Sequence, residues 1–191
     1  MEAAEVRAFV AFDVDAESVA RFAALSERLR GAMPKGMRAG FVAPEKMHVT
    51  MKFLGAMREE LVPTLSEAIR AVAAGPAPIT RAMRLGAFGS PKRAHVIVVE
   101  LDDASGELAR IAAAIDARAA ALGFAREART FRPHLTLARL RQTTDARRVL
   151  ADTGAVPAEE VRVAQLALYR SDPSPHGSVY TPLARAAFSA E

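Results

Sequence analysis

The chain has 191 residues, is 51% hydrophobic, contains no cysteine, and carries a formal net charge of +4 with a sequence pI near 9.9. These values are consistent with one domain of ordinary size and exclude disulfides, thiolate metal sites and a cysteine nucleophile. No run reaches the ~20 apolar residues of a membrane span. Glu2 and Glu5 lie where a secretion signal would carry positive charge, so we expect a cytoplasmic protein.

Arginine supplies most of the positive charge, because the chain has only four lysines. The planar guanidinium group matches the geometry of phosphate, which favours an anionic partner such as RNA. An Ala/Arg-rich composition can equally reflect the base composition of a genome. The charge by itself therefore does not decide between these readings.

In the first part of the chain, hydrophobic periodicity predicts alternating strands and helices. The predicted elements are a strand over 6–14, a helix over 17–33, strands over 38–42 and 46–54, a helix over 59–74 and an extended segment over 79–88. Gly31 and Pro34 are expected to end the first helix. Gly55 is expected to stop the strand over 46–54.

The second part predicts a strand over 95–101, helices over 104–122 and 144–151, and strands over 132–140, 161–170 and 178–188. Thr143 or Thr144 is expected to cap the shorter helix. Regular βα alternation and a Gly-rich phosphate loop are both missing from the sequence, which argues against a nucleotide-binding parallel sheet. The pattern predicts an α+β fold built from two roughly equivalent halves.

Two of these strands carry the same short motif of His, any residue, Thr and an apolar residue. The motif begins at His48 and again at His134, and 134 − 48 = 86 residues separate the two copies. One such match is weak evidence, but two of the chain's four histidines share it. His95 and His176 have no Thr two residues later, and we expect both to be non-catalytic.

Strand alternation predicts which side chains share a face. In the first motif His48, Thr50 and Lys52 share one face, and three apolar residues are expected in the core: Val49, Met51 and Phe53. In the second motif the expected shared face carries Arg132, His134 and Thr136, with Leu135 and Leu137 opposite. Lys52 and Arg132 can also be read as solvated charges at a rim.

Two such rows facing each other would place two imidazoles around one small anionic group. One imidazole could then take a proton while the other gives one. Thr50 and Thr136 could donate hydroxyl hydrogen bonds to the non-bridging oxygens of a phosphate. This chemistry requires no metal and no cofactor.

The motifs, with Phe-Leu-Gly at 53–55 and the run Phe131 to Arg139, resemble the 2H phosphoesterase superfamily. Within it the sequence is most similar to the bacterial and archaeal RNA 2′,3′-cyclic phosphodiesterases, formerly called 2′-5′ RNA ligases. The resemblance covers nearly the whole chain and implies a bilobal fold, with two antiparallel sheets, outer helices and a cleft between the lobes. It implies one domain over 1–191, with pseudo-repeat halves near 1–95 and 96–191.

The resemblance also implies an activity, which is hydrolysis of RNA 2′,3′-cyclic phosphate ends to 2′-phosphate ends, with possible reverse 2′-5′ ligation. It assigns His48 as the proton donor to the leaving oxygen and His134 as the acceptor from water. Arg139 matches an arginine that contacts phosphate in this family. Strict alternation places Arg139 off the His134 face, so a bulge or twist must redirect it.

Other interpretations remain open from the sequence. A sister enzyme could act on a small cyclic phosphate derived from ADP-ribose, and a non-catalytic module could bind RNA in the same basic cleft. Tyr169 and Tyr180 are expected to be structural, with a place in the cleft as the alternative. We expect RNA with 2′,3′-cyclic phosphate ends as the partner of a monomeric protein, without a membrane or an obligate protein partner.

Overall fold

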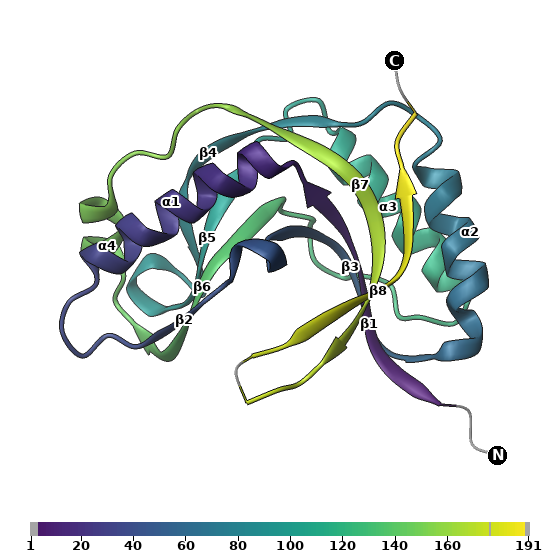
Figure 1. Cartoon of the computed structure of the whole chain (residues 1–191), viewed down its shortest axis with the longest axis horizontal. Coiled ribbons are helices and arrows are strands. Elements are labelled where there is room, and N and C mark those ends of the chain that lie inside the picture. The colour runs from purple at the N-terminus through teal and green to yellow at the C-terminus, as the bar shows by residue number, and fades with distance from the viewer. Residues whose placement is uncertain (1–3, 176, 190–191) are drawn as a thin grey trace.

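The computed structural model describes residues 4–175 and 177–189 (Figure 1). Its strands are β1 (Glu5–Val14), β2 (Ala39–Phe41), β3 (His48–Arg58), β4 (Ile79–Phe88), β5 (Ala94–Leu101), β6 (His134–Thr144), β7 (Glu160–Asp172) and β8 (Val179–Ala187). The pairings between these named strands are all antiparallel. The α+β prediction with antiparallel pairing is confirmed.

Four α-helices and three short 3-10 turns connect the strands in the described part of the chain. The α-helices are α1 (Ala16–Ala32), α2 (Val62–Val72), α3 (Glu107–Ala121) and α4 (Arg147–Thr153), and the 3-10 turns are η1 (Pro44–Lys46), η2 (Glu59–Leu61) and η3 (Pro91–Arg93). The Asp15 carboxylate accepts a hydrogen bond from the Ser18 amide, which caps the start of α1.

Two predicted boundaries are wrong. Gly55 does not stop the strand, because β3 continues to Arg58 through a bulge at which Gly55 adopts a φ of +73°. This left-handed conformation costs glycine little. The last short helix begins at Arg147, since Thr144 still belongs to β6 and Asp145 follows it. The threonines therefore do not cap this helix.

The strands form two four-stranded sheet halves that join into one sheet. One half has the order β8-β7-β1-β3 and the other β4-β5-β6-β2. They meet where Val49 of β3 pairs with Leu135 of β6, and where Ile79–Arg81 of β4 pairs with Glu160–Arg162 of β7. Each half thus combines strands from distant parts of the sequence.

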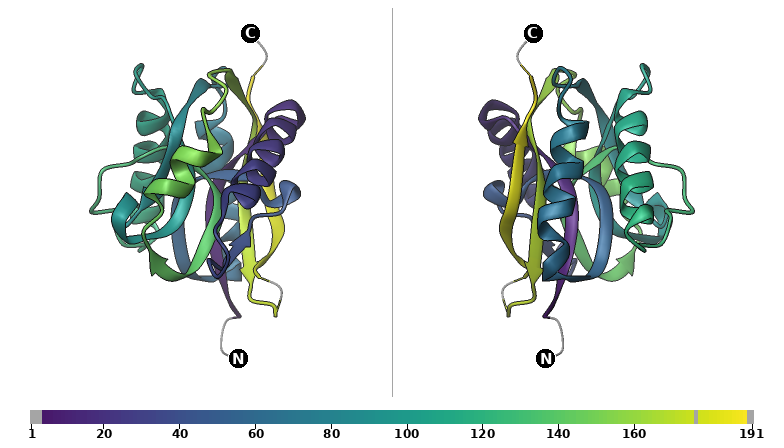
Figure 2. Two further views of the ribbon diagram at one scale, coloured as in Figure 1. Left: turned by 90° about the vertical axis from the view of Figure 1, so that its left-hand side faces the viewer. Right: turned by 90° about the vertical axis from the view of Figure 1, so that its right-hand side faces the viewer.

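Helices cover the outer side of both halves. Helices α2 and α3 pack together, with α2 against β7 and β8 and α3 against β3, whereas α1 and α4 pack on each other beside the other half. Figure 2 shows these two pairs from opposite ends of the molecule. The largest fully buried side chains fill the space between sheet and helices: Phe12, Leu25, Leu29, Met57, Ile69, Ile97, Leu108, Leu135, Leu137, Leu166, Leu168 and Val10.

The face of the sheet opposite the helices carries the polar residues of the two histidine motifs on β3 and β6. The sheet is arched in Figure 1, with β3 and β6 near the middle of the arch. Among the helices of the described residues, none combines the length and apolar character needed to cross a membrane.

Candidate active site

The two His-x-Thr motifs lie side by side at the junction of the sheet halves. Val49 pairs with Leu135, and each of these residues directly follows one of the histidines. Because the strands are antiparallel, this register places His48 level with Thr136 and His134 level with Thr50. One backbone contact between β3 and β6 therefore brings together two histidines that are 134 − 48 = 86 residues apart in the sequence.

Each imidazole is oriented by the backbone of its own strand. His48 Nδ1 lies 2.7 Å from the carbonyl oxygen of Lys46, and His134 Nδ1 lies 2.8 Å from that of Arg132. A carbonyl oxygen can only accept, so Nδ1 must carry the proton in both rings. The neutral form then has a free lone pair on Nε2, which makes Nε2 the atom that can take or give a proton in the cleft.

Burial lowers the pKa of both histidines because it disfavours the charged imidazolium. The carbonyl hydrogen bonds act in the opposite direction and raise each pKa. His134 also lowers the pKa of His48 by charge repulsion. The net shift of both pKa values is downward, so burial favours the neutral form of each ring.

The first threonine already contacts its histidine. Thr50 Oγ1 lies 3.1 Å from His48 Nε2, and since the neutral Nε2 is an acceptor, the hydroxyl donates. Thr136 is half-buried on β6 in the equivalent position of the second motif. Both hydroxyls thus lie beside the space between the imidazoles, where they can turn toward a bound phosphate.

A β-bulge redirects Arg139 toward the histidines. Ile97 pairs with Ala138 and Val98 with Thr136, so Leu137 has no partner in the ladder. The extra residue reverses the alternation beyond it. Arg139 is exposed and lowers the pKa of both His48 and His134 by charge repulsion, so its guanidinium lies near both rings.

The first motif contains a matching bulge, and here the sequence prediction is wrong. Val10 pairs with Lys52 and Ala11 with Thr50, which leaves Met51 without a partner. Beyond this bulge the faces are exchanged, so Lys52 turns to the helix side and Phe53 to the cleft side. Lys52 is 6% exposed, whereas Phe53, expected in the core, is 64% exposed.

The new surroundings of these two side chains are well defined. Lys52 Nζ donates to Asp116 Oδ1 and to the carbonyl oxygen of Ala125, both at 2.6 Å. The Phe53 ring lies 6.2 Å from that of Phe9, which in turn lies 5.0 Å from the His48 ring. Phe53 of the first motif thus takes the place that Arg139 has in the second.

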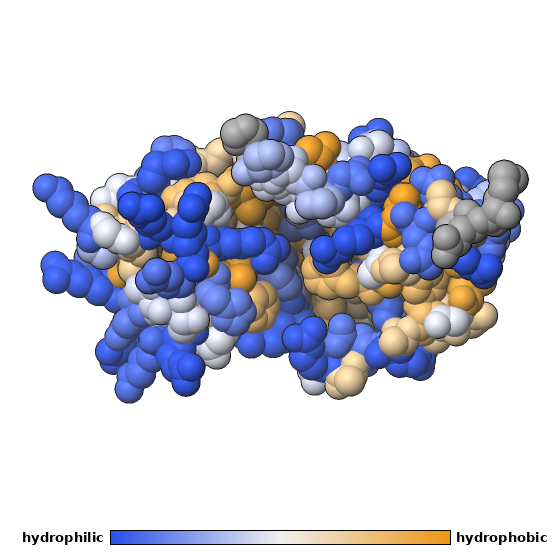
Figure 3. Space-filling view, turned by 90° about the horizontal axis from the view of Figure 1, so that it is seen from below, coloured by the Kyte–Doolittle hydropathy of each residue, from blue (hydrophilic) through white to orange (hydrophobic). Residues whose placement is uncertain are grey.

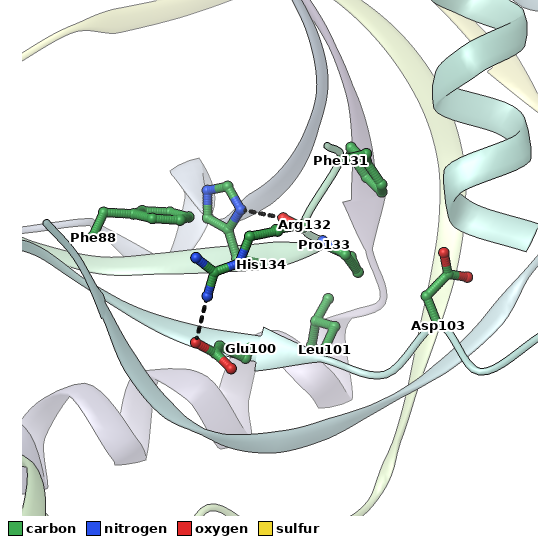
Figure 4. Close-up of a pocket in the computed structure, with 8 residues that line it drawn as sticks. All are labelled: Phe88, Glu100, Leu101, Asp103, Phe131, Arg132, Pro133 and His134. Atoms are coloured by element: carbon green, nitrogen blue, oxygen red, sulfur yellow. Dashed lines mark hydrogen bonds and ion pairs between the residues drawn. The ribbon is translucent and has the colours of Figure 1, made fainter. Parts of the chain in front are cut away.

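Arg132 lies on the predicted face beside His134, held in a network of charges (Figure 4). Its Nη2 donates to Glu100 Oε1 at 3.0 Å, and Arg84 contacts the other Glu100 oxygen at 2.8 Å. The Arg132 guanidinium lies 5.5 Å from the Phe88 ring centre, and the centres of the Phe88 and His134 rings lie 4.5 Å apart in a T-shaped arrangement. A cavity of about 220 Å³ opens here.

A second cavity of about 180 Å³ lies on the His48 side. Tyr169 and Tyr180 line it, so their alternative place in the cleft is the correct one. The Tyr169 hydroxyl donates to Asp13 Oδ1 at 2.7 Å, and Gln165 Nε2 donates to Asp13 Oδ2 at 2.7 Å. Burial and the Asp13 carboxylate raise the pKa of Tyr169 to about 12, so the phenol remains a hydrogen-bond donor.

The cleft face is hollowed near its middle and bordered by hydrophilic side chains, with hydrophobic patches between them (Figure 3). Among the described residues, no group of three or more His, Asp or Glu side chains is arranged to hold a metal ion. What the site offers is a pair of imidazoles, two hydroxyls and at least one guanidinium around a space for an anion.

Sequence reasoning missed the two carboxylates that accompany the histidines. Asp13 pairs with His48 across β1 and β3, and Glu100 pairs with His134 across β5 and β6. The signal was available, because 100 − 13 = 87 residues separate the carboxylates, almost the spacing of the histidines. Each lies at or near the end of a predicted strand, in corresponding positions of the two halves.

The comparisons with known proteins agree with this geometry. A family model described as the 2′-5′ RNA ligase superfamily matches residues 20–175. An RNA 2′,3′-cyclic phosphodiesterase of Archaeoglobus fulgidus is 30% identical over 179 residues, covering 93% of this chain and 98% of the relative. Another from Methanothermobacter thermautotrophicus is 29% identical and covers 94% of this chain and 97% of that protein.

Comparison with solved structures points to the same group of proteins. The apo crystal structure of E. coli LigT is 25% identical in sequence and superimposes with a TM-score of 0.74, covering 97% of this chain and 99% of LigT. Sequence and fold therefore give one answer, over nearly the full length of both partners in each comparison. The chain belongs to the 2′-5′ RNA ligase superfamily of 2H phosphoesterases.

Proposed function

We propose that the protein hydrolyses the 2′,3′-cyclic phosphate at the end of an RNA chain and leaves a 2′-phosphate. The observation that carries this proposal is the arrangement of two imidazoles on adjoining strands, each with Nδ1 fixed by a backbone carbonyl, so that Nε2 is the atom of each ring that can take or give a proton. The names of the relatives support the choice of reaction, since both curated relatives above are RNA 2′,3′-cyclic phosphodiesterases.

The two histidines divide the proton transfers. His134 Nε2 takes a proton from water as the water oxygen forms a bond to phosphorus. The bond between phosphorus and the 3′ oxygen breaks, and that oxygen takes the proton from His48 Nε2. One water is consumed, the ribose regains its 3′-hydroxyl, and the exchange of protons with solvent restores both histidines.

The remaining groups stabilise the charge that develops on the phosphoryl oxygens. The hydroxyls of Thr50 and Thr136 donate to the non-bridging oxygens, and the Arg139 guanidinium adds positive charge next to both imidazoles. Such donors act strongly because they are already oriented in a partly buried site. The mechanism needs no metal or other cofactor.

The same site can also join RNA ends. When a 5′-hydroxyl in place of water attacks the 2′,3′-cyclic phosphate, a base takes the hydroxyl proton, the bond between phosphorus and the 3′ oxygen breaks, and an acid protonates that oxygen, which leaves a 2′-5′ linkage and a free 3′-hydroxyl. We therefore propose reverse 2′-5′ ligation as a second outcome at high concentrations of RNA ends.

The test is incubation of the purified protein, with chelator present, with a short RNA that ends in a 2′,3′-cyclic phosphate. The expected product is a 2′-phosphate end, identified by its resistance to enzymes specific for 3′-phosphates. Turnover of a small ADP-ribose-derived cyclic phosphate without turnover of RNA would contradict the RNA activity and indicate the sister activity instead. RNA binding without turnover of either substrate would identify a binding module instead.

A further inference from the structure

Strands β3 and β6 each have a carboxylate opposite their histidine. The charged groups around the two carboxylates differ. Asp13 faces His48 across one strand pair, and Glu100 faces His134 across the equivalent pair. Each carboxylate lines the same cavity as its histidine. A carboxylate beside an imidazole favours the protonated ring, unless its charge is already neutralised.

The Asp13 carboxylate is held by neutral hydrogen-bond donors. Its oxygens accept from the neutral amide of Gln165 and the neutral hydroxyl of Tyr169, and within residues 4–175 and 177–189 no ion pair joins Asp13 to a cation. The nearby cation on β8, Arg185, contacts the Tyr169 hydroxyl. Because the hydrogen-bond donors to Asp13 are neutral, its negative charge can stabilise a protonated His48.

Glu100 is paired with two cations, which offset its negative charge. Arg84 donates Nε and Nη2 to one carboxylate oxygen, and Arg132 donates to the other. Gly86 leaves room for this arrangement, because a Cβ there would lie 2.5 Å from Glu100 Oε1. The carboxylate opposite His134 is therefore already paired with two arginines.

The other charged groups around each ring do not reverse this difference. Glu45 and Lys46 line the cavity of His48 and have opposite charges, and Arg185 adds a positive charge to the same lining. Asp103 lines the cavity of His134. Arg139 acts on both histidines alike, and the histidines repel each other.

We propose that Asp13 is a positioning residue that favours the protonated form of His48 relative to that of His134, so that His48 serves as the acid, while the Glu100–Arg84–Arg132 network offsets the Glu100 charge and leaves His134 as the base. This proposal rests on the proposed function and explains its direction. In His48 the attraction of Asp13 exceeds the repulsion by Arg139, whereas in His134 the repulsion by Arg132 and Arg139 exceeds the attraction of Glu100. The difference between the two histidines thus comes from the carboxylates next to them on strands β1 and β5 and from the partners of those carboxylates.

The first test is an NMR titration of the imidazoles in the protein without substrate, which does not depend on any activity. Asp13→Asn preserves the hydrogen-bonding shape and is expected to lower the pKa of His48 while that of His134 stays unchanged. Arg84→Met leaves Glu100 with one arginine and is expected to raise the pKa of His134 and leave that of His48 unchanged. Equal effects on both rings, or no effect, would overturn the proposal.

The second test is the pH profile of kcat on the cyclic-phosphate RNA. Asp13→Asn is expected to move the alkaline limb to lower pH and to reduce kcat above pH 7 by roughly tenfold, because fewer His48 rings carry the proton. Asp13→Glu should restore most of this loss. A uniform fall in kcat at every pH, without movement of the limb, would show a merely structural role.

A matched control is Asp152→Asn, which removes an exposed carboxylate on α4 and should leave the profile as in the unmodified protein. If the unmodified protein hydrolyses no cyclic phosphate, the proposed function fails. The titration still decides whether Asp13 and the arginine network separate the two histidines.

Discussion

The Lys52 ammonium on β3 lies 2.6 Å from the Asp116 carboxylate on α3, and both side chains are largely buried. Lys52 also donates to the carbonyl of Ala125, and the same Asp116 oxygen accepts from the Glu127 amide at 3.0 Å. These bonds tie the strand of the first histidine to the segment that leads into the second. The ion pair is thus a structural link between the two motifs.

Removal of this link should destabilise the protein. Lys52→Met leaves the Asp116 carboxylate without its buried partner, and we expect a loss of about 3 kcal/mol in the free energy of unfolding. Urea denaturation measures it. Arg129→Ala, which removes an exposed ion pair with Glu127, is the control and should cost at most about 1 kcal/mol. Equal losses in both variants would contradict the structural role of Lys52.

The exchange of faces at Met51 predicts opposite effects for two neighbouring residues. Phe53 is 64% exposed and Leu54 is 8% exposed. Phe53→Ala should change the free energy of unfolding by about 0.5 kcal/mol or less, whereas Leu54→Ala should cost about 2–5 kcal/mol. Thermal and urea unfolding of the two variants compare them directly. A larger loss for Phe53→Ala would restore the strict alternation predicted from sequence.

Loss of either histidine should remove most turnover without unfolding the protein. His48→Ala and His134→Ala are each expected to reduce kcat by about 10²- to 10⁴-fold, the usual contribution of an acid or base. Steady-state kinetics on the cyclic-phosphate RNA, with circular dichroism to verify folding, measures this. Full activity of His134→Ala would show that the proposed mechanism is wrong.

Arg139 should contribute to the stabilisation of charge. Arg139→Ala removes a guanidinium near both imidazoles, and we expect kcat to fall by about 10²-fold with the fold intact. The control is Arg141→Ala, which removes another exposed arginine of β6 two residues further from His134. The prediction fails if the two variants lose activity to the same extent.

The buried histidines should make stability depend on pH. Their pKa values in the folded protein lie below the unfolded value of about 6.5, so the unfolded chain binds more protons as the pH falls through that value. The free energy of unfolding is therefore expected to decrease from pH 7 toward pH 5. In the His48→Gln/His134→Gln double variant this decrease should be smaller, which urea titrations at both pH values can measure. An unchanged slope would mean that other groups dominate.

The sequence by itself determined the strands, the helices and the pair of motifs. Those features are local, since apolar spacing selects helix or strand and a His-x-Thr pair is visible in four residues. Leu135 and Leu137 are buried as the alternation predicts. The resemblance of the two motifs also led to the family that the comparisons identify.

Only the tertiary structure decided what surrounds the histidines. The bulges leave Met51 and Leu137 without partners in the ladder, and they exchange the faces on which Phe53 and Arg139 lie. Asp13 and Glu100 reach the histidines through pairings between strands that are distant in the sequence. Register between such strands is fixed by packing of the whole sheet, and no local pattern contains it.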